Sequence, residues 1–391
     1  MVLENTALPV IVVIAFNRPN SLSRILMSIS KANYPSKNID LVISIDKTDN
    51  NQNVLEIANK FNWNHGTKKV IYQSENLGLR KHIIKSMSIV HQYDSMIMLE
   101  DDLFVSPDYY NYTQQALNFS YNNDKIGGIS LYNHQLNVYK DQNFTAIDDG
   151  FDNWYFQFAS SWGQAWNVKH IKLFLEWYET NPEINALDVV PKYVRNWSDK
   201  SWLKYFISFV IIKNKYFMYP KISLTTNFGD QGVNMDMSNT YFQVPILNFY
   251  GKKYNFSKLE DSHSIYDAFY ENLNLNETLG FQKEEITIDL YGYKNIFKRY
   301  LLSSQQHHYF IIKTFGRSFK PHDLNILYNI EGKDFYLYDT EVIAKNKFNS
   351  NPFYILDYNI KMISLPQAFS IFKFKFEQRL KIFLYNIFKR T

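Results

Sequence analysis

The sequence predicts an α/β fold in which helices flank a mostly parallel sheet. Between residues 9 and 100, short runs of apolar and β-branched residues alternate with segments whose apolar residues recur at helical spacing. Such alternation is typical of strand–helix–strand units with parallel strands. The 391 residues are 46% hydrophobic and 20% charged, a composition typical of a folded globular protein rather than a disordered chain.

Four strands and three helices are expected in this first region. The run PVIVVIAF at 9–16 is apolar throughout, as expected for a parallel strand that is buried on both faces. Asn20 or Ser21 is suited to cap the helix that follows, which has apolar residues at helical spacing. The other expected strands are 39–45, 69–73 and 95–99, and the other expected helices are 54–61 and 79–91.

The pattern becomes looser after residue 102. We expect a helix at 107–119, a strand at 127–131, a helix at 168–178, a glycine-containing loop at 227–234 and a hairpin around 331–334. Residues 1–250 are expected to form a catalytic domain. Residues 251–391 are expected to form a mixed and helical C-terminal extension that ends in a basic amphipathic segment, 366–391.

Glycine spacing and composition exclude several classes of enzyme. None of the 13 glycines precedes Gly66, and no two stand two, four or five residues apart, so G-x-G-x-x-G, G-x-S-x-G and P-loop motifs are absent from the sequence. The sequence also has no H-E-x-x-H and no Cys. These absences argue against dinucleotide oxidoreductases, P-loop NTPases, lipase-type hydrolases, zincins and thiolate metal sites.

The positive charge of the chain is concentrated in its last segment. The net charge is 42 − 38 = +4, and segment 366–391 holds six Lys/Arg and one acid, so it contributes +5 and the rest of the chain −1. A nearly neutral body argues against nucleic acid as a partner. The absence of Cys and of any apolar run near ~18 residues leads us to expect a cytoplasmic protein.

Polar residues follow the expected strands at the points where they end. They are Arg18, Asp46, Asn76 and the consecutive acids Glu100, Asp101 and Asp102. Ligands of open α/β sheets bind at the carboxyl ends of the strands, so we expect these side chains to converge there. The acids are suited to bind a divalent cation such as Mg²⁺ or Mn²⁺, or else form a solvated loop. Arg18 is suited to bind a phosphate or a nucleobase edge, or else is a surface residue near a helix start. Asp46 is suited to accept from a nucleobase, or else caps a turn.

Together these motifs resemble the GT-A fold glycosyltransferases, in particular the family 2-like bacterial enzymes and the N-acetylglucosaminyltransferase I group. The resemblance covers roughly residues 8–240 and rests on the motifs IAFNRP (14–19), SID (44–46), ENLGLR (75–80), LEDDLFVSPDYY (99–110), SWGQAW (161–166) and NFGDQGVN (227–234). It implies a nucleotide-sugar donor, for which we expect a UDP-sugar, and a divalent cation, Mn²⁺ or Mg²⁺.

The resemblance also assigns roles to individual residues. It implies that Asp102 binds the metal, and that Asp101 and Glu100 lie near the ribose and the sugar. It further implies that Arg18 and Asp46 hold the nucleotide, that Asn76 belongs to an Asn-x-Gly element, and that Ser161, Trp162 and Gly163 line the donor sugar and the acceptor.

The resemblance implies that the catalytic base is an Asp between two tryptophans, and the nearest match in this sequence is Asp199, between Trp197 and Trp202. The family's spacing between these tryptophans is shorter, and relatives often carry His where this chain has Asn234. Asp199 also fits the cap of a helix, and Asp230 and Asp152 are alternative bases. Trp154 and Trp162 fit either stacking on a sugar or packing in the core.

The function expected from these features is that of an inverting, metal-dependent hexosyl- or N-acetylhexosaminyltransferase in bacterial surface polysaccharide synthesis (capsule or O-antigen). It would use a glycan or lipid-linked glycan acceptor. One alternative is a non-catalytic carbohydrate-binding or scaffold protein on the same fold. The other is a sugar-phosphate nucleotidyltransferase, which would need a Gly-rich loop after the first strand, and residues 9–30 contain no Gly.

The last segment repeats apolar residues at spacings of three and four, with basic residues beside them. Such a helix is typical of a peripheral contact with an anionic membrane surface, here the inner face of the cell membrane. A helix packed on the body, a homodimer contact or a strand over 372–376 are the alternatives.

Overall fold

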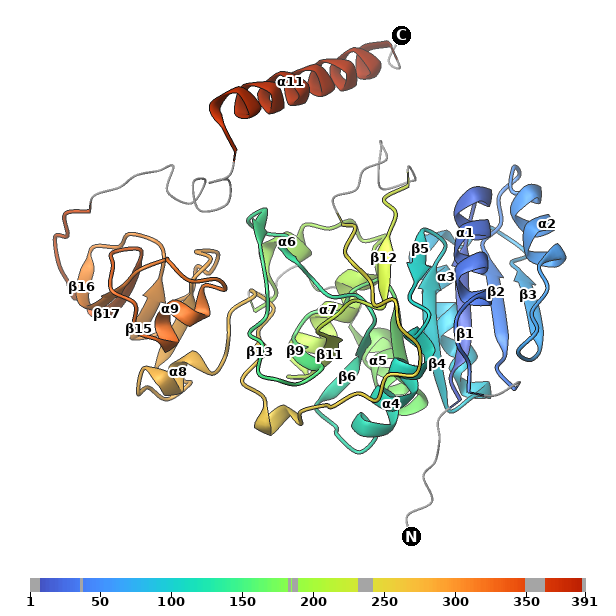
Figure 1. Ribbon diagram of the computed structural model, residues 1–391, viewed down its shortest axis with the longest axis horizontal. Coiled ribbons are helices and arrows are strands. Elements are labelled where there is room, and N and C mark those ends of the chain that lie inside the picture. Colours follow the sequence, from blue (N-terminus) through green and yellow to red (C-terminus); the bar gives the residue numbers. More distant parts are fainter. Residues whose placement is uncertain are drawn as a thin grey trace. The chain divides into compact units, whose positions relative to one another are not determined.

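The computed structural model of the protein describes residues 8–35, 38–181, 184, 189–230, 242–348 and 363–388. The chain forms two compact units, Met1–Lys345 and Asn346–Thr391. The first unit contains a large sheet and a smaller C-terminal sheet, and the described part of the second contains one long helix (Figure 1).

The large sheet has nine strands and helices on both of its faces. Its strands are β1 (Val10–Ala15), β2 (Leu41–Ile45), β3 (Lys68–Tyr72), β4 (Ser95–Glu100), β6 (Ile126–Ser130), β9 (Asn153–Phe156), β10 (Gln164–Asn167), β11 (Tyr216–Pro220) and β13 (Ile265–Tyr266). The helices are α1 (Pro19–Ser30), α2 (Gln52–Lys60), α3 (Gly78–Met87), α4 (Tyr109–Ser120), α5 (Val168–Thr180), α6 (Lys192–Arg195) and α7 (Trp202–Ile212).

The strand order is β13-β9-β11-β6-β10-β4-β1-β2-β3, with five parallel and three antiparallel pairs. The predicted α/β class, with a mostly parallel sheet flanked by helices, is confirmed, and the arrangement agrees with the expected GT-A fold. Strand β10 runs antiparallel between β4 and β6. The start of β10 therefore lies at the same edge of the sheet as the carboxyl ends of β1 and β4.

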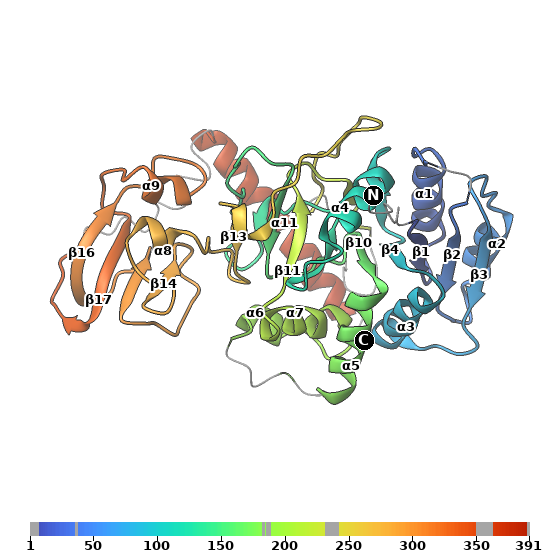
Figure 2. The same ribbon diagram turned by 90° about the horizontal axis from the view of Figure 1, so that it is seen from below.

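Strand β1 shows why its sequence is apolar throughout. Val10, Val12 and Ile14 pack with residues of α3, α5 and α7 on one face of the sheet. The alternate residues of β1 pack with residues of α1, α2 and α4 on the other face (Figure 2). All six residues of β1 are at most 5% exposed, because both faces of a central parallel strand are covered.

The first helix begins earlier than expected. Arg18 is the N-cap residue of α1 and Pro19 opens the helix, so Asn20 and Ser21 lie within its first turn. Proline is well suited to this position, because its fixed φ is already helical and it has no N–H that needs a partner.

The C-terminal part of the first unit forms a sheet of four strands in the order β14-β15-β17-β16. Its elements are α8 (Leu275–Thr278), β14 (Ile286–Asp289), β15 (Tyr300–Ser303), β16 (Tyr309–Phe315), α9 (Asp323–Leu327) and β17 (Phe335–Ile343). Strands β16 and β17 pair antiparallel, with Phe315 opposite Phe335. The hairpin expected around 331–334 differs in its connection: β16 and β17 are consecutive antiparallel strands, but residues 316–334, which include α9, join them instead of a short turn.

The described helix of the second unit is α11 (Leu365–Phe388). The apolar spacing of three and four predicts this helix, and the strand alternative over 372–376 is wrong. No helix among the described residues has both the length and the apolarity needed to cross a membrane.

Gly128 and Gly127 of β6 provide a matched test of packing in the large sheet. A Cβ atom on Gly128 would lie 2.5 Å from Nε1 of Trp166 and 2.6 Å from Cζ of Phe217, two fully buried rings, whereas the nearest atom to a Cβ on Gly127 is 3.4 Å away. We predict that Gly128→Ala lowers the free energy of unfolding by about 1–3 kcal/mol. Gly127→Ala should leave it within ~0.5 kcal/mol of the parent. Chemical denaturation measures both, and equal effects would contradict this account.

Candidate functional site

The carboxyl ends of β1, β2, β3 and β4 and the start of β10 lie at one edge of the large sheet. The parallel register places Ile14 opposite Glu100, Ala15 opposite Ile45, and Ile45 opposite Tyr72. Gln164, the first residue of β10, is opposite Met98. This register brings Arg18, Asp46, the three consecutive acids and the segment before β10 to the same edge.

Arg18 forms ion pairs with both Asp101 and Asp102. Its Nη1 lies 3.0 Å from Oδ2 of Asp102, and its Nη2 contacts Oδ1 of Asp101. The two aspartates are 3% and 8% exposed. Burial raises the pKa of Asp101 to about 6, although the charge of Arg18 pulls that pKa down. The two carboxylates are close together and shielded from water, so their negative charges would repel each other. The positive charge of the Arg18 guanidinium compensates this repulsion.

Each of these aspartates keeps one oxygen uncommitted. Oδ2 of Asp101 and Oδ1 of Asp102 are buried and have no hydrogen-bond partner among the described residues. Buried polar atoms are normally paired, so unpaired carboxylate oxygens here are consistent with a ligand. Within the described ranges, no three His, Cys, Asp or Glu side chains are grouped to hold a metal by themselves. The residues therefore fit a cation held by one or two carboxylates together with phosphates of a substrate.

The pKa of Glu100 is also shifted by its surroundings. Burial and then the Asp102 carboxylate raise the pKa of Glu100 to about 8, while a hydrogen bond with the Trp202 side chain lowers it. Glu100 therefore holds a proton at neutral pH when no cation is bound. The contact with Trp202, the first residue of α7, also places the start of α7 beside the acids.

Asp230 lies near the three consecutive acids, and its charge contributes to the raised pKa of Asp101. The sequence indicated Asp230 only as an alternative catalytic base. The Phe228 N–H donates to the backbone oxygen of Asp102 at 2.9 Å, so the loop after β12 (Thr225–Asn227) runs along the acids. The Asp230 carboxylate pairs with Arg24 and accepts from Ser21 Oγ at 2.7 Å. The glycine-containing motif at 227–234 indicated this loop, but Asn234 lies outside the described residues.

Asp46 holds the loop that leads into α3. Its carboxylate accepts from the N–H groups of Leu77 and Gly78, both at 2.9 Å, and from its neighbour Lys47 at 3.0 Å. Asp46 is 3% exposed, whereas Asn76 in the same loop is exposed. The loop therefore presents Asn76 to solvent while Asp46 fixes its backbone.

The segment Ser161, Trp162 and Gly163 precedes β10 and is held by close packing. Gly163 has φ +95°, and a Cβ there would lie 2.9 Å from Cγ2 of Thr225. Trp162 is partly exposed and packs against Tyr132, with ring centroids 4.6 Å apart. Trp154, by contrast, is fully buried. Its Nε1 donates to Pro220 O at 3.2 Å, so Trp154 belongs to the core and stacking of Trp154 on a sugar is wrong.

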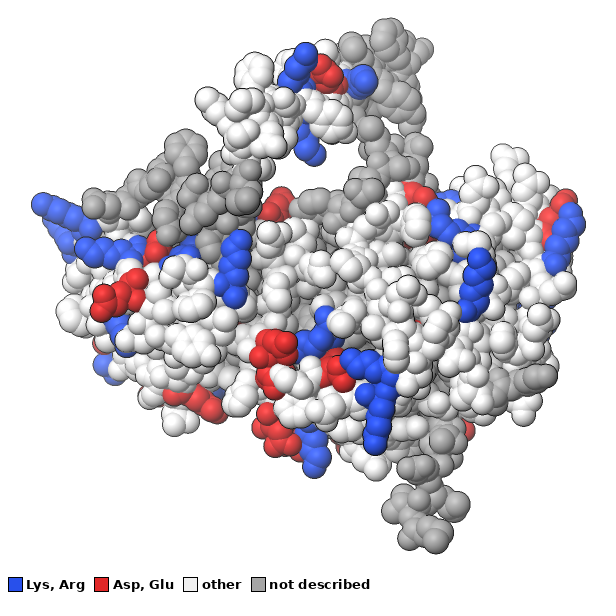
Figure 3. Space-filling model, in the orientation of Figure 1, with Lys and Arg blue, Asp and Glu red and all other residues white. Residues whose placement is uncertain are grey.

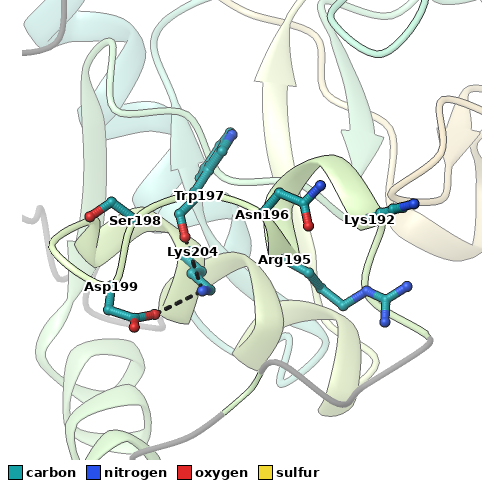
Figure 4. A pocket seen from close by; sticks show the side chains of 7 residues that line it. All are labelled: Lys192, Arg195, Asn196, Trp197, Ser198, Asp199 and Lys204. Atoms are coloured by element: carbon teal, nitrogen blue, oxygen red, sulfur yellow. Dashed lines mark hydrogen bonds and ion pairs between the residues drawn. The ribbon is translucent and has the colours of Figure 1, made fainter.

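Asp199 lies in a polar pocket of about 520 Å³ beside α7 (Figure 4). Its Oδ1 is 2.9 Å from Nζ of Lys204, a side chain that is only 2% exposed, while Asp199 is 67% exposed. The hydrogen bond and charge of Lys204 lower the pKa of Asp199, which is therefore ionised at neutral pH. Ser201 is the N-cap of α7, so the alternative that Asp199 caps this helix is wrong.

Asp152, the other alternative base, lies far from this group in the sheet. It precedes β9, and β11, β6 and β10 separate β9 from β4. Four strand spacings correspond to about 19 Å. The Asp152 carboxylate pairs with Lys252 at 2.6 Å and accepts from Asn255 N at 2.8 Å. These contacts give Asp152 a structural role away from the acids.

No protein-family model matches the chain, and no curated protein is similar to it in sequence. Among solved structures, it is similar to S. aureus TarS 1–349, with a TM-score of 0.37 and 10% identity over 55% of this chain and 59% of that chain. TarS 1–349 in complex with UDP-GlcNAc gives a TM-score of 0.34 and 11% identity over 65% of this chain and 61% of that chain. Mannosyltransferase PcManGT from Pyrobaculum calidifontis, in complex with GDP-Man and Mn²⁺, is similar with a TM-score of 0.31 and 11% identity over 43% of this chain and 46% of that chain. The matched region spans less than two thirds of each of these chains.

The raised pKa of Glu100 predicts a pH-dependent stability. The pKa is about 8 in the folded chain and 4.5 without the fold, so the folded state retains a proton that the unfolded state releases between these values. The stability from this group is full below pH 4.5 and is lost as the pH rises towards 8. We predict that Glu100→Gln, measured with a chelator, gains on the order of 2 kcal/mol over the parent across this window.

The matched control for this measurement is Glu56→Gln, which removes an exposed acid of α2. The gain of Glu100→Gln over the parent should exceed any effect of this control substitution. A difference between Glu100→Gln and the parent that is constant from acid to mildly alkaline pH would contradict the assignment.

Proposed function

We propose that this chain is a glycosyltransferase that moves a sugar from a nucleotide-diphosphate sugar, a UDP-sugar, to a hydroxyl group of a glycan acceptor. The observation that carries the proposal is the pair of buried, uncommitted oxygens on Asp101 and Asp102, at the carboxyl edge of a parallel sheet and beside Arg18. An anionic leaving group needs neutralisation, and a guanidinium together with a carboxylate-held cation would provide it. The resemblance in the motifs around these residues supports the same reaction.

In this proposal Asp102 holds the divalent cation, Mn²⁺ or Mg²⁺, and Asp101 and Glu100 lie near the ribose and the sugar. The cation would supply positive charge that stabilises the departing diphosphate. Arg18 contacts phosphate or nucleobase once substrate draws it from the aspartates, and the loop fixed by Asp46 presents Asn76 to the nucleotide. Ser161, Trp162 and Gly163 line the donor sugar and the acceptor.

Asp199 is proposed as the general base. A sugar hydroxyl has a pKa far above neutral, so it needs a group that takes its proton as it attacks the anomeric carbon. Asp199 is ionised and open to solvent, and it lies three residues from Trp202, which contacts Glu100. A single displacement of this kind inverts the anomeric configuration. The ion pair with Lys204 would orient the carboxylate.

The proposed biological role is hexosyl or N-acetylhexosaminyl transfer in the synthesis of a bacterial surface polysaccharide, with a glycan or lipid-linked acceptor. Such acceptors would place a cytoplasmic enzyme peripherally at the inner face of the cell membrane. The test is release of UDP from a panel of UDP-sugars with and without Mn²⁺. Release that needs an acceptor supports a transferase, whereas a nucleotidyltransferase would form the donor from sugar phosphate and a scaffold would release nothing.

We predict that Asp102→Ala removes the Mn²⁺-dependent part of UDP binding and preserves the fold. The variant lacks the carboxylate proposed to coordinate the cation. It also has less repulsion among the neighbouring acids, so weaker UDP binding could not be explained by added electrostatic repulsion. Calorimetric titration with UDP and Mn²⁺ measures the affinity. Asp124→Ala, which removes an exposed acid paired with Lys169, is the control and should bind as the parent does. Unchanged affinity of Asp102→Ala would remove Asp102 as the ligand.

We predict that Asp199→Asn keeps UDP binding and lowers turnover by about 100-fold or more, because an amide cannot take the proton. This substitution also leaves the buried Lys204 with Trp197 O as an acceptor but without its carboxylate. The double variant Asp199→Asn/Lys204→Met separates the two roles. Recovery of turnover in the double variant would show that Asp199 only compensates Lys204, whereas continued loss supports the base.

A further inference from the structure

Helix α11 carries an apolar surface that the proposed transferase chemistry does not use. Seven large apolar side chains on it are between 48% and 85% exposed, and six of these recur at helical spacing: Leu365, Phe369, Phe372, Phe376, Leu380 and Phe383. We call these six residues the apolar stripe. So large a run of exposed rings on one helix marks an interaction site rather than ordinary surface variation.

The spacing of the apolar stripe describes the shape of the surface that it fits. Its steps are 4, 3, 4, 4 and 3 residues, which sum to 18 over five steps, a mean of 3.6. This is the period of a straight α-helix, so the stripe runs parallel to the helix axis. A left-handed coiled coil between two copies would favour a repeat of 3.5 residues. The stripe therefore matches a flat surface better than a partner helix that coils around it.

The basic residues of α11 stand on both sides of the stripe. At about 100° per residue, Lys373 and Arg379 lie about 60° to either side of its centre, with Lys375 beyond Arg379. From 365 to 383 the helix has four basic residues and one acid, Glu377, a net charge of +3. Figure 3 shows basic side chains projecting from α11 beside uncharged surface. Long basic side chains in these positions extend to the polar boundary of the layer in which the stripe is buried.

We propose that α11 lies flat in the interface of an anionic lipid bilayer, with the apolar stripe among the acyl chains and Lys373 and Arg379 at the headgroup phosphates. The positive charge of the helix complements the negative surface of such a bilayer, and its apolar side supplies the burial. The proposal extends the peripheral location proposed above to named residues. It does not depend on the transferase reaction.

The first test is co-sedimentation of the full chain with vesicles of phosphatidylglycerol and phosphatidylcholine, compared with phosphatidylcholine alone. Phe376 is in the stripe and Phe374 is about 160° from its centre, yet they are 60% and 57% exposed, so they form a matched pair. Phe376→Ser should weaken vesicle binding about ten-fold and Phe374→Ser much less. Equal effects of the two substitutions would overturn the flat orientation.

The second test concerns charge. Lys373→Gln should weaken binding to anionic vesicles about five-fold, and Lys381→Gln, about 140° from the stripe centre, should do so less. Raising salt from ~0.15 M to ~1 M shortens the Debye length from ~8 Å to ~3 Å and should release much of the protein. Binding that ignores lipid charge and salt would overturn the electrostatic part of the proposal.

Two further measurements distinguish membrane binding from the alternatives, in which a second copy or another part of this chain covers the apolar stripe. Sedimentation equilibrium that gives a dimer broken by Phe376→Ser, without vesicle binding, would assign the stripe to a second copy. A loss of body stability in Phe376→Ser, again without vesicle binding, would assign it to packing within the chain. Calorimetric UDP binding is measured on the same samples, so failure of the proposed donor site is distinguished from failure of membrane binding.

Discussion

The bridge from Arg18 to Asp101 and Asp102 is the interaction on which the candidate site depends. Two adjacent carboxylates that are 3% and 8% exposed need a compensating cation, and Arg18, the N-cap residue of α1 just after β1, supplies it. The parallel pairing of β1 with β4 makes this possible, because it brings the two carboxyl ends together. A phosphate that binds Arg18 would leave the two aspartates without their counter-charge, and a cation that binds the aspartates would do the same to Arg18. The binding of a cation together with a phosphate is therefore favoured.

Local patterns in the sequence were sufficient to predict five of the nine strands of the large sheet, β1 to β4 and β6, and much of its edge. The apolar run of β1 indicates burial on two faces, and the structure shows covering helices on both. Strand ends carry the polar residues, so parallel order alone brings Arg18, Asp46 and Glu100 to one edge. These features depend on periodicity and on the direction of neighbouring strands, which a short stretch of sequence encodes.

The parts that could not be predicted depend on contacts between distant residues. Asp230 is held by Arg24 and Ser21, more than 200 positions earlier in the chain, and no local pattern indicates such a pair. Lys204 reads as an exposed helix residue until the fold buries it against Asp199. Trp154 looked suited to a sugar until the strands around it left it no exposed surface. Similarly, α9 follows from packing in the C-terminal sheet rather than from the turn residues expected at 331–334.

The antiparallel strand β10 has a consequence for how the chain assembles. Among the described strands of the large sheet, it joins β3-β2-β1-β4, made early in the sequence, to β6-β11-β9-β13, whose last strand ends at Tyr266. The two halves of the sheet are therefore joined only when β10 pairs with β4 on one side and with β6 on the other. Ser161, Trp162 and Gly163 lie directly before that strand. A nascent chain that has made only the first four strands would present the acids and Arg18 without this segment, so the candidate site would be complete only when the two halves of the sheet join.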